Sequence, residues 1–163
     1  MLENANKTPL SEYGEFGLIE LLTKNIKLKN QSTILGVGDD AAILNVQNRY
    51  QLVSKDLLME GIHFDIRYYP LKHLGYKAIA VNLSDIAAMN AKPEQVLVGI
   101  AASSRYTVEA IEEIYAGMYL CCEHYGVDLV GGDTTSSVSG LCISVTALGY
   151  AQPKTIVRRN TAQ

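Results

Sequence analysis

Apolar residues recur at a helical spacing in three parts of the chain, and this pattern predicts three helices. They are expected at Gly14–Lys29, Leu71–Asn90 and Thr107–Gly126. Pro93 should prevent the second helix from continuing. Thr107 can cap the start of the third helix, and Gly126 stands where a C-terminal glycine belongs.

Runs of aliphatic and β-branched residues between these helices predict strands. They are expected at Tyr50–Leu58, Glu94–Ser103 and Leu141–Ala151. A further strand, DLVGGDTTSS, begins at Asp128 and is predicted to run into a glycine-rich turn. Strands and helices alternate, but several connections are short enough for hairpins. The pattern therefore favours an α/β (α+β) domain, with a mixed sheet and helices packed on one face.

Composition narrows the range of partners. The 163 residues fit one domain, and 48% of them are hydrophobic, so a packed core is expected. The net charge of -3 argues against a nucleic-acid-binding face, and no apolar run approaches the length of a membrane span. Cys121, Cys122 and Cys142 are interpreted as reduced core residues of a cytoplasmic protein without a secretory signal. Residues 1–13 are expected to be flexible.

Several aspartates stand in segments that are otherwise apolar. They are Asp39, Asp40, Asp56, Asp85 and Asp133. An ionised carboxylate in apolar surroundings is costly unless it is paired or binds a metal, and the only adjoining basic residue is Lys55, beside Asp56. Oxygen ligands without His or Cys are those that Mg²⁺ prefers, so these positions suggest a site for more than one Mg²⁺ ion.

Each of these positions also has a simpler explanation. Asp39 and Asp40 fit an ordinary turn, and Asp133 could cap a strand-to-helix turn. Asp85 follows Asn82 by about one helical turn, so both side chains should share a face, but a structural buried Asp is possible there. Single His and Tyr residues such as His63 and Tyr115 are commonly packing or surface groups.

Five motifs together resemble one known family. GEFGLI, GVGDDAAIL, SKDLLMEGIHF, YKAIAVNLSDIAAMNAKP and DLVGGDTT follow in the order and spacing of the thiamine-monophosphate kinases. These enzymes belong to the aminoimidazole ribonucleotide synthetase-like superfamily. The resemblance implies that residues 14–163 form the N-terminal ATP- and Mg²⁺-binding domain, with a mostly antiparallel sheet. It also implies homodimerisation, and a C-terminal domain that is absent from this chain.

The resemblance also implies roles for particular residues. The Mg²⁺ ligands would be Asp39, Asp40, Ser54, Asp56, Asp85 and Asp133. ATP would contact Tyr115, Gly132, Asp133 and Arg159, and His63 would contact the phosphate-bearing substrate. Lys55 departs from the family, which has a threonine there. Its backbone carbonyl could still bind Mg²⁺, or its ammonium could contact a phosphate.

The implied reaction is ATP-dependent phosphorylation of thiamine monophosphate to thiamine diphosphate, with ATP as co-substrate. An acceptor phosphate oxygen is already charged near pH 7, so no catalytic residue is expected to act as a general base. Positioning and charge neutralisation by several Mg²⁺ ions would carry the reaction. Two alternatives are another ATP-dependent enzyme of the superfamily and a non-catalytic dimerisation module.

Overall fold

The computed structural model describes residues 12, 14–47 and 49–161. The predicted flexible segment 1–13 lies outside these residues, except for residue 12. Residues 1–31 and 32–163 form two separate compact units. In the described part of the first unit, the chain forms the helix α1 (Gly14–Thr23).

The prediction that this first helix continues to Lys29 is wrong. The Thr23 hydroxyl donates to the Ile19 carbonyl at 2.7 Å, and the Ile26 amide donates to the Thr23 carbonyl in a tighter turn. Thr23, Asn25 and Ile26 all have lower helix propensity than the leucines before them, so the helix ends here.

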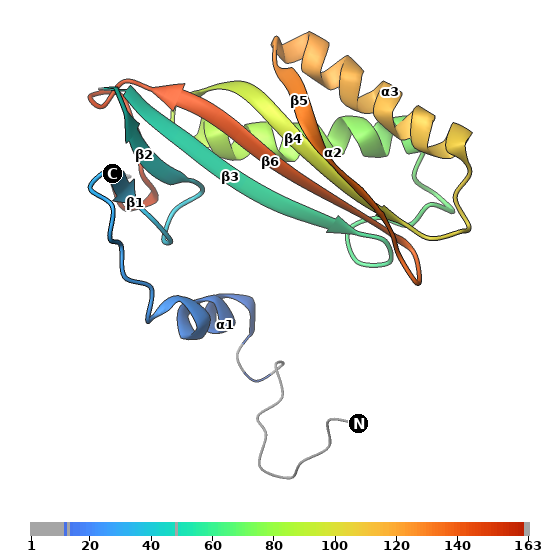
Figure 1. Ribbon diagram of the computed structural model, residues 1–163, viewed down its shortest axis with the longest axis horizontal. Helices are drawn as coiled ribbons and strands as arrows, with labels where there is room; N and C mark the ends of the chain where they lie inside the picture. The colour runs from blue at the N-terminus through green and yellow to red at the C-terminus, as the bar shows by residue number, and fades with distance from the viewer. Residues whose placement is uncertain (1–11, 13, 48, 162–163) are drawn as a thin grey trace. The chain divides into compact units, whose positions relative to one another are not determined.

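The second unit contains one sheet of six strands and two long helices (Figure 1). In chain order its main elements are β1 (Thr33–Leu35), β2 (Ala42–Val46), β3 (Arg49–Met59), α2 (Leu71–Ala88), β4 (Lys92–Ala102), α3 (Val108–Tyr125), β5 (Asp128–Ser136) and β6 (Leu141–Ala151), followed by a short 3-10 helix (Arg159–Thr161). The strand order is β1-β2-β3-β6-β4-β5, and every pair except β4 and β5 is antiparallel. The predicted mixed, mostly antiparallel sheet is therefore confirmed.

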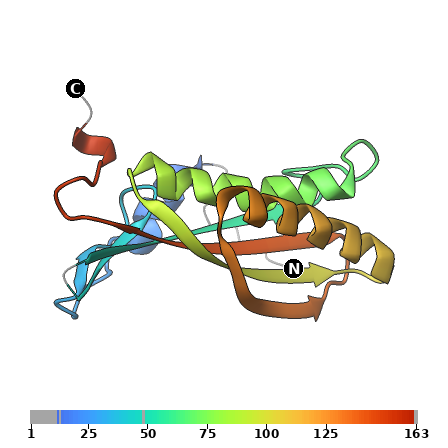
Figure 2. The ribbon, with the colours of Figure 1, turned by 90° about the horizontal axis from the view of Figure 1, so that it is seen from above.

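The alternation of buried residues along β6 defines the two faces of the sheet. From Leu141 to Ala151, every second residue is buried and the residues between them are half-buried. The buried set faces α2, which packs on β3, β6 and β4, and we call this side the helix face. The other side is the open face. Figure 2 shows α2 and α3 on one side of the sheet, which confirms the predicted single helical layer.

Two glycines allow the helices to approach closely. A Cβ built on Gly75 of α2 would lie 1.8 Å from the Ile114 carbonyl oxygen, and one on Gly117 of α3 would lie 1.8 Å from the Lys72 carbonyl oxygen. The two backbones therefore touch where side chains would normally separate them. The helix α3 begins and ends as predicted, with Thr107 accepting from the Ala110 amide and Gly126 in the left-handed conformation.

The sequence patterns did not anticipate three other features. The hairpin of β1 and β2 surrounds Asp39 and Asp40, where no strands were predicted. The strand β5 continues through Gly131 and Gly132 without the predicted turn. Cys121 and Cys122 are buried as expected, but Cys142 is only half-buried, because it lies on the open face opposite Met59.

Candidate functional site

The strand β3 and the helix α2 bring three of the predicted ligands together. Ser54 and Asp56 pair with Ala147 and Val145, so both side chains lie on the helix face. The Ser54 hydroxyl donates to Asp85 Oδ2 at 2.7 Å, across 31 residues of sequence. We call Ser54, Asp56 and Asp85 the carboxylate cluster.

Buried Asn82 fixes the geometry of this cluster. Its side-chain oxygen accepts from the Asp56 amide at 3.1 Å, and its nitrogen donates to the Ala78 carbonyl at 3.0 Å. Both polar ends of the amide are thus satisfied, which a fully buried amide requires. The expectation that Asn82 and Asp85 share one side of the helix is confirmed, because each contacts β3.

The charges in the cluster are unbalanced. Partial burial raises the pKa of Asp56, and the neighbouring charge of Asp85 raises it further, while His63 lowers it. The Met59 amide donates to Nδ1 of exposed His63 at 2.9 Å, so a neutral His63 has its hydrogen on Nε2. Two carboxylates, a hydroxyl and a neighbouring amide form an oxygen-rich environment that fits a hard divalent cation.

Asp39 and Asp40 form a second group with Arg159. The Arg159 amide donates to Asp39 Oδ2 at 3.1 Å, and its guanidinium forms an ion pair with Asp40. These aspartates have no basic neighbour in the sequence, but the fold brings Arg159, which is distant in sequence, into contact with them. Ala42 pairs with Val53, which brings the start of β2 alongside the part of β3 that contains Ser54.

Asp133 lies apart from both groups. It is exposed, pairs with Gly99, and lies on the open face, whereas Asp56 lies on the helix face. Three inter-strand steps separate β5 from β3, which is about 14 Å at the usual strand spacing. In the described part of the chain, no three His, Cys, Asp or Glu side chains are arranged to hold one metal ion. That Asp133 shares ions with the other aspartates therefore stays a prediction.

A β-bulge explains the position of Asp133. Leu129 pairs with Val96 on the helix face, but the next bridge joins Gly131 to Leu97, so Val130 is an extra residue. One inserted residue moves every following side chain to the opposite face of a strand. Gly132 lies just beyond, and a Cβ there would meet the Val98 carbonyl oxygen at 1.7 Å. Only glycine permits this close approach of the backbones.

Lys55 also lies on the open face. Its ammonium donates to the Ser144 hydroxyl at 2.6 Å and lies 3.4 Å from the Thr146 hydroxyl. The side chain therefore points away from the carboxylate cluster, although it stands between Ser54 and Asp56 in sequence. Of the two roles considered for Lys55, only the backbone carbonyl is compatible with a ligand at that cluster.

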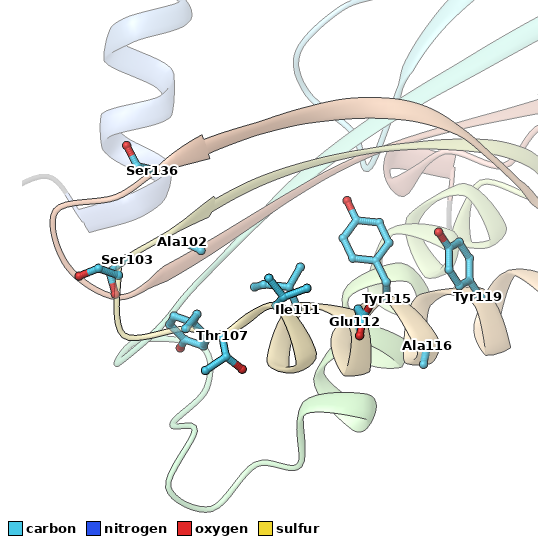
Figure 3. Close-up of a pocket in the computed structure, with 12 residues that line it drawn as sticks. Ala102, Ser103, Thr107, Ile111, Glu112, Tyr115, Ala116, Tyr119 and Ser136 are labelled. Carbon is cyan, nitrogen blue, oxygen red and sulfur yellow. The ribbon is translucent and has the colours of Figure 1, made fainter.

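A groove of about 810 Å³ lies between α3 and the ends of β4 and β5. Tyr115 lines it, as do Ile111 and Tyr119 of the same helix and Ser136 of β5, as Figure 3 shows. The rings of Tyr115 and Tyr119 are 5.9 Å apart at an interplanar angle of 55°. Buried Ser103 also lines the groove, and its hydroxyl has no hydrogen-bond partner among the described residues. Sequence reasoning identified Tyr115 but did not recognise that most of residues 102–119 line one groove, which Ser136 of β5 completes.

Comparison with known proteins identifies the family. The family model for the N-terminal domain of AIR synthase related proteins matches residues 38–151. The chain belongs to this family. Within it, the chain is 41% identical to the thiamine-monophosphate kinase of Synechococcus elongatus and 37% identical to that of Bacillus subtilis, over 94% and 91% of its length. It spans 45% and 46% of these two relatives, about half their length.

Solved structures of this AIR synthase related family share the fold. The structure described as "AaThiL complexed with AMPPCP and TMP" superposes with a TM-score of 0.85 and 33% sequence identity, over 98% of this chain and 48% of that one. Thiamine monophosphate kinase from Aquifex aeolicus superposes with a TM-score of 0.73 and 30% identity, over 92% and 46%. The predicted fold is thus confirmed by sequence and by structure. Among the described residues, no helix is both long and apolar enough to cross a membrane.

Proposed function

We propose that the protein containing this chain transfers the γ-phosphoryl group of ATP to thiamine monophosphate, and that this chain is its N-terminal half. The observation that supports this most directly is the carboxylate cluster, where Ser54 and Asp85 are bonded at 2.7 Å beside Asp56. The relatives of this chain are named thiamine-monophosphate kinase, and one similar structure is described as a complex with AMPPCP and TMP.

Two sites on this chain would have different functions: one would bind Mg²⁺ and the other the adenine of ATP. The carboxylate cluster would hold Mg²⁺, which screens the repulsion between acceptor phosphate and triphosphate when it is bound. His63, which lies close enough to Asp56 to lower its pKa, would face the acceptor phosphate. The groove beside Tyr115 would receive the adenine, because its aromatic and aliphatic walls suit a flat base. Asp133 and Gly132 of β5 would contribute ATP contacts near that end.

Asp39 and Asp40 would become Mg²⁺ ligands when the substrates are bound. Asp39 and Asp40 are paired with Arg159 in this structure, and we propose that Arg159 turns to the ATP phosphates while the aspartates bind Mg²⁺. Such an exchange keeps each charge compensated, which partly buried ionic groups require. The side chain of Arg159 is 61% exposed, so it can move without disrupting the core.

The open face would join two copies of the chain. Leu57 and Met59 of β3 are 53% and 43% exposed there, and Leu97 of β4 is 39% exposed. A sheet face with this much exposed apolar surface is typical of an interface. Since a two-fold axis places the same surface on both partners, we propose a homodimer formed through this face. Cytoplasmic localisation and the absence of nucleic-acid partners belong to the same proposal.

Substitution of Asp85 by Asn in the full-length protein tests the reaction and the metal site together. We expect turnover of thiamine monophosphate with Mg-ATP to fall at least about a hundredfold, because the cluster loses the carboxylate bonded to Ser54. Mg²⁺-dependent binding of a non-hydrolysable ATP analogue should weaken in parallel. Near-normal turnover would contradict the proposed role of Asp85.

A panel of phosphorylated acceptors separates the proposed reaction from the alternatives. Thiamine monophosphate should stimulate ADP release by the full-length protein, whereas acceptors of related superfamily enzymes should not. Release stimulated by another acceptor would favour a different enzyme of the superfamily. No release and no Mg-ATP binding by the full-length protein would favour a dimerisation module.

A further inference from the structure

A carboxylate outside the predicted ligand set lies where three loops meet. Glu60 directly follows β3, and its side chain is 15% exposed. Its Oε1 accepts from Arg105 Nη2 at 2.6 Å, and its Oε2 accepts from the Tyr106 hydroxyl at 2.7 Å. Burial raises the pKa of Glu60, but the hydrogen bonds from Tyr106 and Arg105 outweigh it and lower the pKa. Glu60 is therefore ionised at neutral pH.

The third loop that meets Glu60 connects β5 to β6, which lie on either side of β4 in the sheet. The Glu60 amide donates to the Leu141 carbonyl at 2.9 Å, and the Ser103 amide donates to the Gly140 carbonyl at 3.0 Å. A Cβ on Gly140 would lie 3.2 Å from Glu60 Oε2, so the backbone passes close to the carboxylate. The loops that follow β3 and β4 and the loop that precedes β6 are thus held at one point.

Glu60 connects the two regions proposed to bind the substrates, the groove beside Tyr115 and the turn that contains His63. Tyr106, which bonds to Glu60, lines the groove beside Tyr115. On the other side, Glu60 begins the turn that contains His63, in which Gly61 donates to the Phe64 carbonyl at 2.8 Å and His63 to the Met59 carbonyl at 2.9 Å. One carboxylate therefore joins the wall of the groove to the turn that presents His63.

We propose that Glu60 is a positioning residue, which fixes the turn containing His63 relative to the groove so that both substrates are held in one geometry. This inference rests on the proposed function. The ion pair with Arg105 is largely exposed on the arginine side, so it adds little to global stability. Geometry is the more sensitive property, since a misplacement of about 1 Å can cost about a hundredfold in rate.

Kinetics of the full-length protein test whether Glu60 acts through His63. Glu60→Gln and Tyr106→Phe should each raise the KM for thiamine monophosphate about tenfold, although neither side chain faces the acceptor. In a His63→Ala background, Glu60→Gln should cause no further change in that KM. Glu113→Gln, an exposed carboxylate of α3 outside the groove lining, is the matched control and should match the wild type.

Two kinetic outcomes would overturn the proposal. If the effects of Glu60→Gln and His63→Ala multiply, the two residues act independently. If Glu60→Gln only lowers the melting temperature and leaves both KM values unchanged, its role is structural.

Hydrogen exchange of the ligand-free protein gives a readout that does not depend on the reaction. Glu60→Gln should speed amide exchange at residues 61–64 and 103–106 about tenfold, with little change in α2. Unchanged exchange in both loops would refute the positioning role. If the wild type does not phosphorylate thiamine monophosphate, the proposed function fails, and this measurement still decides the structural part of the inference.

Discussion

Asp56 and Asp85 are half-buried neighbours, and the described residues provide neither with an ion pair to Lys or Arg. Burial raises the pKa of Asp56, and the repulsion from Asp85 raises it further. Carboxylates with perturbed pKa values, which destabilise the folded state, are common at functional sites. The pair is therefore expected to lower stability until a cation binds.

The first prediction is that Asp56→Asn stabilises the metal-free protein at neutral pH. The folded-state pKa of Asp56 lies above its usual value of 3.8, so protonation favours folding, and the ionised group destabilises the fold at higher pH. The variant should melt a few degrees above the wild type at pH 7, and the gain should disappear as the pH falls through the raised pKa toward 3.8. Thermal melts in EDTA across this pH range measure it.

Magnesium supplies the control for this prediction. Adding Mg²⁺ at pH 7 should raise the melting temperature of the wild type more than that of Asp56→Asn, because ligands stabilise the state that binds them. Equal shifts in both proteins would show that Asp56 does not bind the ion. A variant that is less stable than the wild type at pH 7 without metal would contradict the assigned cause of the pKa shift.

The sequence predicted the partners in the carboxylate cluster better than the position of Asp133. Helical spacing placed Asp85 and Asn82 on one face, and both contact β3 as that spacing requires. The extra residue Val130 determines on which face of the sheet Asp133 lies, and the residue pattern does not predict a bulge there. Likewise Arg159 follows Asp40 by 119 residues, so only the folded chain shows their ion pair.

At the scale of elements, the contact between α2 and α3 depends on the absence of two side chains. Gly75 and Gly117 each face a carbonyl oxygen of the other helix at a distance that no Cβ tolerates. Helix periodicity located both helices, but it gave no reason for a glycine inside each of them. The reason is the neighbouring helix, which the local sequence does not contain.

The second prediction concerns this contact. Gly75→Ala should lower the free energy of unfolding by about 1–3 kcal/mol, because the methyl group forces the backbones apart. In an exposed helix the same change would stabilise by about 1 kcal/mol, so the sign itself is informative. Urea denaturation measures it, with Ser84→Ala on the exposed side of α2 as the control. A stabilised Gly75→Ala variant would contradict the close packing.

At the scale of the whole molecule, the open face of the sheet carries exposed apolar side chains, among them Leu57, Met59 and Leu97. The apolar residues of this face come from β3, β6 and β4, and the charged Lys55 lies between them. The alternation of buried and half-buried residues in β6 is typical of a strand whose two faces have different neighbours. A second copy of the chain would give this face its missing partner.

The third prediction is that charge on the open face separates the dimer. The full-length protein should sediment as a dimer at micromolar concentration, and Leu57→Lys should sediment as a monomer with unchanged helix content. An added ammonium at a buried two-fold interface would face its own copy or apolar surface, which is costly in either case. A variant that remains dimeric would place the interface elsewhere.

The fourth prediction concerns the half of the relatives' length that this chain spans. The 163-residue chain alone should turn over thiamine monophosphate at less than about one hundredth of the full-length rate, because the proposed site here gathers only some of the ligands. Product formation by equal molar amounts of both proteins measures it. Full-rate turnover by the shorter chain would show that its own residues suffice.

Of the six strands that the structure describes, β6, one of the two in the middle of the sheet, is the last to be synthesised. Because β6 lies between β3 and β4, a nascent chain that has left the ribosome only as far as β5 has no neighbour for the inner edge of either strand. Unpaired edges of this kind invite pairing with other chains, and chaperones exist in part to shield them. Emergence of residues 141–151 from the ribosome is thus the step that gives both strands their missing neighbour, and a pause in translation that delays this emergence would prolong the exposure.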